Sequence, residues 1–244
     1  MTPALDWDSL GQNAGVELDR ETLAQLRAFA GLLLRANQRM NLTRITGEPE
    51  LLEKHLLDAL VGAPLLAGPR GAPPETLVDV GSGGGVPGLP LAILWPGCRV
   101  LLVDAEARKV EYLRDAVRAL GLTSRVEAVQ ARAEVLGRDP ARREAFEAAT
   151  LRAVGPVSTC LELGLPLVRP GGRLLLYRGP GEAEAEERAV ERVSPLLGGG
   201  APRGQEIVLP SQARRRLIRV EKLTSTPEAY PRRDGVPARR PLEG

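Results

Sequence analysis

The sequence has few aromatic residues, few cysteines and a single histidine. Phe, Trp and Tyr make up 3% of the 244 residues, so we expect an aliphatic core and no recognition surface built from rows of stacked aromatic rings. The two cysteines, Cys98 and Cys160, lie far apart in the sequence, which suits a reducing compartment better than a disulfide scaffold. Because His55 is the only histidine and no Cys/His cluster exists, we expect no metal site.

Long apolar runs are also missing. No stretch approaches the roughly 18 apolar residues that a membrane-spanning helix needs. The first residues lack a basic segment followed by an apolar one, so we expect no secretory signal. We therefore expect a cytoplasmic protein without a membrane span, and a monomer by default.

The composition is that of a folded protein with an uneven charge distribution. Apolar residues make up 43% and charged residues 26%, which excludes wholesale disorder. The formal net charge is +2, but residues 201–244 hold ten Lys or Arg and five Asp or Glu. A basic C-terminal part on a nearly neutral body indicates a polyanionic partner.

The pattern of apolar residues divides the chain in two. Helical spacing dominates residues 1–70, with one helix through residues 23–34 and a second from about Pro49 to Leu66. A Pro- and Gly-rich stretch, 68–75, then marks a boundary. Short strands alternate with helices in 71–244, which predicts an α/β fold with a mostly parallel sheet covered on both faces. Strands are predicted at 76–80, 100–105, 125–129, 148–152 and 173–177, and a closing antiparallel pair at 205–209 and 215–220.

The most informative stretch is the glycine-rich run from Asp79 to Gly88, which follows the first predicted strand. Glycines let the backbone approach a nucleoside closely, and a helix that begins there offers free N–H groups. The run fits the dinucleotide pattern G-x-G-x-x-G, a weak signal alone. Asp79, two residues before Gly81, would repel a pyrophosphate but attract the positively charged end of S-adenosylmethionine (SAM), with Ser82 and Gly83 in the same turn.

Two later segments extend this site. Asp104 ends the second predicted strand, where a carboxylate accepts the hydroxyls of a ribose and rejects a 2′-phosphate. Ala105 and Glu106 follow it and would border the adenine or ribose. Arg132, Ala133 and Glu134 follow the third strand, where such folds recognise adenine, although a surface-charge role fits this triplet equally well.

Taken in order, these segments resemble the RsmG (GidB) family of bacterial methyltransferases, which modify N7 of one guanosine in 16S ribosomal RNA. The resemblance runs from about residue 40 to the C-terminus, and the glycine-rich block is its most specific part. The matching segments are Asn41-Leu42-Thr43, Lys54-His55-x-x-Asp58, Asp79 to Gly88, Asp104, Lys109, Arg132-Ala133-Glu134, Arg152-Ala153, Arg178-Gly179 and Tyr230-Pro231-Arg232. Two residues depart from the family pattern, Val86 in place of Phe and Arg178 in place of Lys.

The resemblance implies a class I SAM-dependent methyltransferase fold, SAM as cofactor and the small ribosomal subunit as partner. It assigns residues to the SAM pocket and a basic cluster to the RNA: Gly81, Val86, Asp104 to Glu106, Ala133, Glu134 and Arg152 for SAM, and Arg132, Arg152 and Arg178 for RNA. We assign Arg132 and Arg178 mainly to phosphates, and Arg152 to the boundary between cofactor and RNA. Arg214, Arg215 and Arg216 of the basic C-terminal part are further RNA-binding candidates, or a solvated strand face. For His55 and Asp58, a helix-packing role is the stronger expectation, and Asn41 and Thr43 fit turn or cap residues.

Methylation of guanine N7 is consistent with the lack of an evident general base or nucleophile in the sequence. N7 of guanine carries a lone pair at neutral pH, so its methylation needs no general base, and none is evident. Cys160 lacks the Pro-Cys context of a cytosine-C5 nucleophile, and we expect both cysteines to pack in the core. Two alternatives stay open on the residues alone: an NAD-dependent oxidoreductase that uses Gly83 to Gly88, and a non-enzymatic RNA-binding assembly factor.

Overall fold

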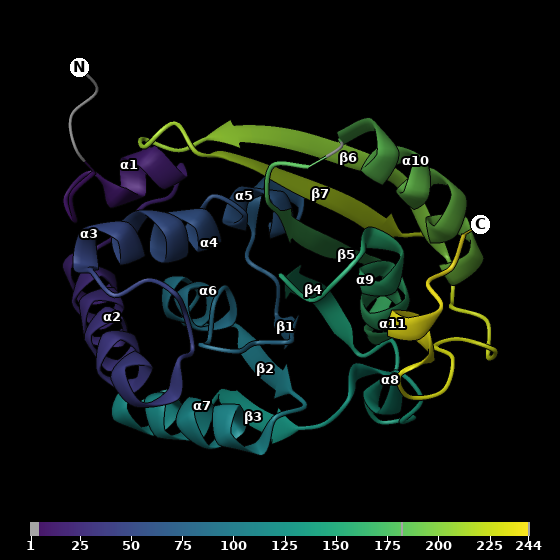
Figure 1. Cartoon of the computed structure of the whole chain (residues 1–244), viewed down its shortest axis with the longest axis horizontal. Helices are drawn as coiled ribbons and strands as arrows, with labels where there is room; N and C mark the ends of the chain where they lie inside the picture. The colour runs from purple at the N-terminus through teal and green to yellow at the C-terminus, as the bar shows by residue number, and fades with distance from the viewer. Residues whose placement is uncertain (1–4, 182, 244) are drawn as a thin grey trace.

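The computed structural model describes residues 5–181 and 183–243. The predicted N-terminal segment 1–70 is thus described from residue 5, and the predicted core 71–244 without Glu182 and Gly244. A seven-stranded sheet crosses the molecule in the order β3-β2-β1-β4-β5-β7-β6 (Figure 1). Its strands are β1 Thr76–Val80, β2 Arg99–Asp104, β3 Val126–Gln130, β4 Phe146–Arg152, β5 Val168–Arg178, β6 Gly199–Val208 and β7 Arg214–Lys222.

The first five strands are parallel, and β7 pairs antiparallel with both β5 and β6. This confirms the predicted mostly parallel sheet and its closing antiparallel pair. Leu77 and Val78 on β1 belong to two different hydrophobic clusters, as do Leu101 and Leu102 on β2. Because successive side chains of a strand point to opposite faces, near-continuous apolar strands such as these need cover on both sides.

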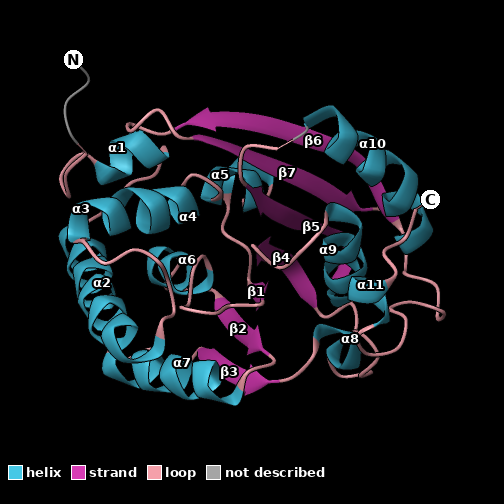
Figure 2. Cartoon of the chain, in the orientation of Figure 1, coloured by secondary structure: helices cyan, strands magenta, loops and turns pink. Residues whose placement is uncertain are grey.

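One face of the sheet is covered by the N-terminal helices together with α6 and α7 (Figure 2). These helices share one hydrophobic cluster with the sheet, so the N-terminal segment packs as part of the main body. The covering elements are α1 Leu10–Ala14, α2 Arg20–Met40, α3 Glu48–Leu51, a π-helical turn Leu52–Leu57, α4 Asp58–Leu60, α5 Ala63–Leu66, α6 Gly88–Leu94 and α7 Ala107–Ala119. A short 3₁₀ turn, Pro69–Gly71, leads into β1.

The other face is covered by helices of the second half of the chain. They are α8 Ala133–Leu136, α9 Val157–Gly164, α10 Ala183–Val193 and α11 Val236–Arg239, with 3₁₀ turns at Leu165–Leu167 and Ser194–Leu197. The C-terminal segment is anchored by Arg232, whose guanidinium Nη2 lies 2.6 Å from the carboxylate of the fully buried Glu162. In the described part of the chain, no helix is both long and apolar enough to cross a membrane.

Candidate active site

A cavity of about 350 Å³ lies at the carboxyl ends of β1, β2 and β4. In doubly wound folds, ligands bind at this edge of the sheet. Its floor is the glycine-rich loop, and its cover comes from α2, from the loop after α2 and from the π-helical turn. The lining residues are Leu33, Leu42, Thr43, His55, Gly81 to Gly84, Val86, Asp104, Lys109, Arg152 and Ala153.

The glycine-rich loop is held in a conformation that side chains would disrupt. Gly81 has φ 73°, and a Cβ there would lie 2.7 Å from Val154 Cγ2. At Gly84 a Cβ would lie 3.0 Å from Leu33 Cδ1, so α2 packs directly on the loop. The hydroxyl of Ser82 donates to Asp79 O (2.8 Å) and accepts from Val103 N–H (3.1 Å). The Ser82 side chain therefore ties β1 to β2.

Asp104 lines the cavity and braces the same loop. Its Oδ2 accepts the N–H of Gly83 at 2.9 Å, and its Oδ1 accepts the N–H of Glu106 at 2.9 Å. A carboxylate oxygen accepts more than one hydrogen bond, so both oxygens retain capacity for a hydroxyl pair. The site thus combines a preorganised acceptor with a close-approach backbone loop, which fits the ribose of a nucleoside cofactor.

Asp79 occupies a different place from the one that the sequence suggested. Its carboxylate accepts the hydroxyl of Thr150 at 2.7 Å and the N–H of Gly88 at 3.2 Å, and it is 1% exposed. Burial raises its pKa to about 6. The expected contact with the positive end of SAM is therefore not supported, because this side chain joins β1 to β4 and to the start of α6 beneath the cavity.

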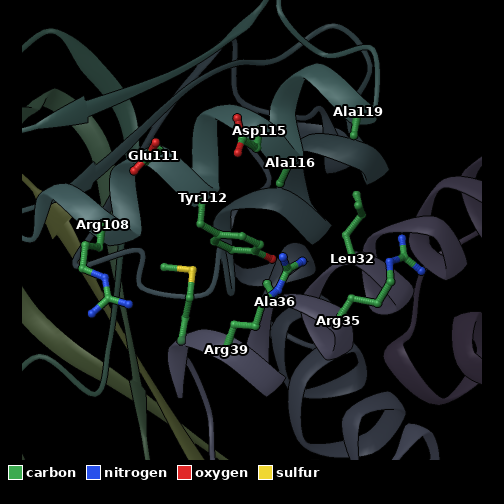
Figure 3. A pocket seen from close by; sticks show the side chains of 11 residues that line it. Leu32, Arg35, Ala36, Arg39, Arg108, Glu111, Tyr112, Asp115, Ala116 and Ala119 are labelled. Carbon is green, nitrogen blue, oxygen red and sulfur yellow. The ribbon is translucent and has the colours of Figure 1, made fainter.

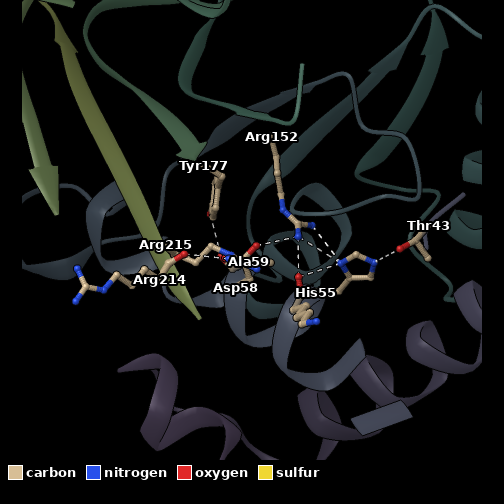
Figure 4. A network of polar contacts seen from close by, with 9 residues as sticks. Thr43, His55, Asp58, Ala59, Arg152, Tyr177, Arg214 and Arg215 are labelled. Carbon is tan, nitrogen blue, oxygen red and sulfur yellow. Dashed lines mark hydrogen bonds and ion pairs between the residues drawn. The ribbon is translucent and has the colours of Figure 1, made fainter. Parts of the chain in front are cut away.

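Arg152, at the end of β4, is the centre of a polar network (Figure 4). Its Nη2 donates to Lys54 O at 2.6 Å and lies 2.8 Å from Asp58 Oδ2, and its Nη1 lies 3.3 Å from His55 Nδ1. Asp58 Oδ1 also accepts from Arg215 Nε of β7 at 3.1 Å. The π-helical turn brings Lys54 O and His55 to one side of the helix, and such turns recur at functional sites.

A second cavity of about 350 Å³ adjoins the first. It is lined by Asp58, Arg152, Ala153, Tyr177, Arg178, Gly179 and Arg215. Arg152 and Ala153 line both cavities. Ala153 has φ 57°, an unusual conformation for a residue with a side chain.

The remaining basic candidates are mostly engaged by carboxylates. Arg178 is held by Glu186 and donates from Nη1 to Gly155 O at 2.7 Å. Arg216 pairs with Glu187, and Arg215 with Asp58. Arg214 is exposed. The assignment of these arginines to RNA binding stays a prediction. Arg178 and Arg215 line the same cavity.

The predicted adenine-binding residues lie outside the lining of the first cavity. Glu134 Oε1 accepts the N–H of Gly235 at 2.9 Å, so the C-terminal segment engages this carboxylate. Arg132 is largely exposed and faces Asp234 at 3.6 Å. Ala105 and Glu106 are exposed beside Asp104, and Ala133 is buried. Their role in binding adenine stays a prediction.

Sequence reasoning missed part of the cover. Leu33 and Leu42 line the cavity, although Leu33 was expected only to belong to a helix and Leu42 had no predicted role. Asn37 holds the loop after α2 by accepting the N–H of Thr43 (2.8 Å) and donating to Ile45 O (3.0 Å).

A groove between α2 and α7 lies apart from these cavities (Figure 3). The Tyr112 ring points into it, and Arg35, Arg39 and Arg108 surround it. It includes none of the residues predicted to bind cofactor or RNA.

His55 is 9% exposed, and burial lowers its pKa to about 4 from 6.5, with a further contribution from Arg152. The folded state then binds fewer protons than the unfolded state, so this contribution to stability is complete above pH 6.5 and is lost as the pH falls toward 4. We expect wild type to lose about 2 kcal/mol more of its free energy of unfolding than His55→Gln between pH 7 and pH 4.5.

Denaturant unfolding of both proteins at the two pH values measures this difference. Asp79, with its raised pKa, contributes in the opposite direction, losing stability as the pH rises from 3.8 to about 6. The contribution of Asp79 is the same in wild type and in His55→Gln, so it cancels when their losses are compared. Equal losses in the two proteins would contradict a neutral, buried His55.

Comparison with known proteins identifies the family. Residues 22–197 match the family model GidB, described as rRNA small subunit methyltransferase G. A protein named ribosomal RNA small subunit methyltransferase G from Moorella thermoacetica is 39% identical over 96% of each chain. One of the same name from Synechococcus elongatus is 40% identical over 98% of each chain.

The chain belongs to the rRNA small subunit methyltransferase G family. This confirms the resemblance found in the sequence and the expectation of a methyltransferase. The NAD-dependent oxidoreductase and the non-enzymatic assembly factor are not favoured by these matches.

Solved structures confirm the fold class. An O-methyltransferase from Bacillus cereus, in complex with SAH, aligns with a TM-score of 0.59 at 17% identity, covering 88% of this chain and 98% of its own. An O-methyltransferase from Streptomyces achromogenes, in complex with SAM, aligns with a TM-score of 0.55 at 16% identity, covering 92% and 100%. Both have the class I methyltransferase fold, which the family member described here shares.

Proposed function

We propose that this protein transfers a methyl group from SAM to N7 of a guanosine in 16S rRNA of the small ribosomal subunit. The observation that carries the proposal is the pair of adjoining cavities that share Arg152 and Ala153. One cavity has the features of a nucleoside cofactor site, and the other is walled by arginines. Because ribosomal subunits are assembled in the cytoplasm, we infer that the protein works there.

The first cavity fits SAM. Each carboxylate oxygen of Asp104 accepts one backbone N–H, from Gly83 or Glu106, and would accept a ribose hydroxyl with its remaining lone pair. Gly81, Gly83 and Gly84 would let the backbone lie against the cofactor without a Cβ in the way. When bound, SAM supplies an electrophilic methyl group on a sulfonium centre.

The second cavity fits a nucleotide of an RNA chain. Arg152, Arg178 and Arg215 contribute three guanidinium groups to its wall, and cations of this kind hold phosphates. The pairings with Asp58 and Glu186 fix all three of these side chains in place before RNA arrives. Unstacking the target base costs a few kcal/mol, and contacts to phosphate groups would offset that cost.

The ionisable residues around the cavities suit a reaction without proton removal. The pKa of His55 is about 4, which makes its imidazole a weak base, and both of its ring nitrogens are in contact with protein atoms. The Asp58 carboxylate is held between two arginines. Cys160 is buried, and burial raises its pKa to about 11. In the part of the chain that is described, no side chain at the wall shared by the two cavities is free to act as a general base. Methylation of N7 does not require one. The chain's task is then to align the reactants, which supplies roughly 7–11 kcal/mol in well-oriented reactions.

Arg152 has one geometric constraint in this reaction. A guanidinium that donates to N7 would occupy the lone pair that attacks the methyl group. Arg152 therefore has to hold the guanine through O6 or through a phosphate, unlike the bidentate O6 and N7 contact common in DNA recognition.

The proposal is tested by incubating the protein with methyl-labelled SAM and small subunits that lack the modification. We expect the label on one guanosine of 16S rRNA, at N7, located by strand cleavage that is specific for 7-methylguanosine. Label on another base atom or on a protein would contradict the proposal.

Arg178→Ala is expected to weaken RNA binding and leave SAM affinity unchanged, because Arg178 lines only the second cavity. Removing one phosphate contact should reduce the slope of log K against log salt by about 1. Filter binding over a range of salt and calorimetry with SAM measure the two effects. Arg178→Lys keeps the charge and should keep the slope, and a loss of SAM affinity in Arg178→Ala would contradict this division of roles.

A further inference from the structure

The groove between α2 and α7 has an apolar floor and basic edges (Figure 3). Its volume is about 460 Å³, which is within the range of pockets that hold small organic ligands. Arg35 and Arg39 on α2 and Arg108 on α7 stand around it. The floor is made by apolar side chains and one aromatic ring from the two helices: Leu32, Ala36, Met40, Tyr112, Ala116 and Ala119.

The three arginines of the groove are not neutralised by carboxylates. All three are exposed, and within residues 5–181 and 183–243 none of them forms an ion pair or a hydrogen bond. Two carboxylates also line the groove. Asp115 pairs with Arg118 of the same helix, so Glu111 alone opposes the three cations. The charge of the groove therefore favours an anionic partner.

Tyr112 gives a second, independent indication of a ligand. It is 7% exposed, and its hydroxyl is buried without a hydrogen-bond partner in the described part of the chain. A buried tyrosine hydroxyl usually has such a partner. Burial raises the pKa of Tyr112, so the hydroxyl keeps its proton and can donate. The ring points into the groove (Figure 3), where the exposed, unpaired arginine side chains can move to admit an acceptor.

The groove begins beside the first cavity. At the start of α7, Arg108 lines the groove and the next residue, Lys109, lines the cavity. At the end of α2, Met40 lines the groove, and Leu42 in the following loop lines the cavity. A chain that lies in the groove therefore leads towards the cofactor site. The anionic chain that the proposed function brings to this site is 16S rRNA.

We propose that the α2–α7 groove holds a nucleotide of the rRNA other than the one that is methylated. The inference rests on the proposed function for the identity of the RNA. The arginines would hold phosphates beside this nucleotide, and its base would lie on the apolar floor. The Tyr112 hydroxyl would donate to an acceptor atom of the base. Because all four RNA bases carry acceptors, this contact positions the RNA without selecting one base.

Removing two of the arginines tests the phosphate contacts. In filter binding to 16S rRNA over a range of salt, Arg39→Ala/Arg108→Ala is expected to lower the affinity about 10-fold or more. The slope of log K against log salt should fall by about 1.5. SAM affinity and the single-turnover rate at saturating RNA should stay within about twofold, because neither arginine lines the two cavities.

A matched double variant controls for the loss of charge. Arg20→Ala/Arg114→Ala removes one exposed arginine from each of the same two helices, outside the groove. It should keep the salt slope and most of the RNA affinity of wild type. Equal losses in the two double variants would overturn the proposal, and so would an Arg39→Ala/Arg108→Ala variant that binds RNA as wild type does.

Tyr112→Phe tests the hydroxyl separately. We expect RNA binding to weaken about 3- to 10-fold, as for the loss of one hydrogen bond, with the salt slope unchanged. The free energy of unfolding should not fall, because the hydroxyl has no partner in the described part of the chain to lose. A fall in stability with RNA affinity unchanged would overturn the role of Tyr112 in binding.

Failure of the proposed function would be seen in a different measurement. Wild type would then bind rRNA without transferring a methyl group to it. The comparison of RNA affinities between wild type, the groove variants and the matched control would still decide whether the groove holds RNA.

Discussion

Replacing Arg152 by alanine is expected to lower the single-turnover rate of methyl transfer to small subunits by about 100-fold or more. Arg152 lies on the wall shared by the two cavities and is fixed by Asp58, His55 and Lys54 O. Its loss removes the group that aligns the cofactor with the target nucleotide. A misplacement of about 1 Å can lower the rate of reaction about 100-fold. Rapid mixing with saturating SAM and subunits measures the rate of the chemical step.

The same substitution should also reduce the free energy of unfolding, by about 1–3 kcal/mol. Asp58 is 2% exposed and keeps Arg215 as partner, so its carboxylate is not left entirely unpaired. Arg118→Ala, on the exposed side of α7, is a matched control and should change neither quantity. A rate within threefold of wild type in Arg152→Ala would contradict the role assigned to the shared wall.

Replacing Asp104 by alanine is expected to weaken SAM binding by about 100-fold. The variant loses the acceptor for the ribose and also the two hydrogen bonds that brace Gly83 and Glu106, and hydrogen bonds to a charged group contribute about 1.5–3 kcal/mol each. RNA binding should stay nearly unchanged, because Asp104 does not line the second cavity. Calorimetry with SAM and filter binding with RNA measure the two affinities.

Asp115→Ala removes an exposed carboxylate from α7 and serves as the control for Asp104. It should leave both affinities unchanged. If Asp104→Ala lost RNA affinity as strongly as SAM affinity, the two cavities could not have separate ligands.

The alternation of short apolar strands with helices was enough to predict the architecture. Strand β1 matches its predicted range, 76–80, and the antiparallel β6 and β7 were predicted from their apolar runs. These elements follow from burial on both faces of a sheet, which leaves a local pattern in the sequence. The helix predicted over 49–66 is broken by a π-helical turn, which no apolar periodicity encodes.

The glycine-rich loop and Asp104 could be predicted because their roles follow from neighbouring residues in the sequence. The direction in which a side chain points depends on tertiary contacts and could not be predicted in this way. Asp79 sits in the predicted motif, yet its carboxylate turns toward Thr150 beneath the cavity. Glu134 follows the predicted strand, yet a residue 101 positions away, Gly235, engages it. Long-range partners of this kind come from tertiary packing and have no signal in the sequence around the residue.

His55 and Asp58 illustrate the same limit from the other side. Both were expected to pack within a helix, and in the structure both contact Arg152. The contact joins residues almost a hundred positions apart, and only the fold brings them together. Thr43 was expected to be a turn residue, and its acceptance of the Ile45 N–H agrees with that, but its position at the cavity wall depends on Asn37 and His55.

The most direct test of the account replaces the attacking atom. Small subunits are rebuilt with 16S rRNA that carries 7-deazaguanosine only at the position that is methylated, so that carbon replaces N7. Single-turnover transfer from labelled SAM is then compared with subunits that carry guanosine there. The account predicts full transfer to guanosine and none to 7-deazaguanosine, with RNA affinity unchanged. Transfer to the 7-deazaguanosine subunits at a comparable rate would contradict it.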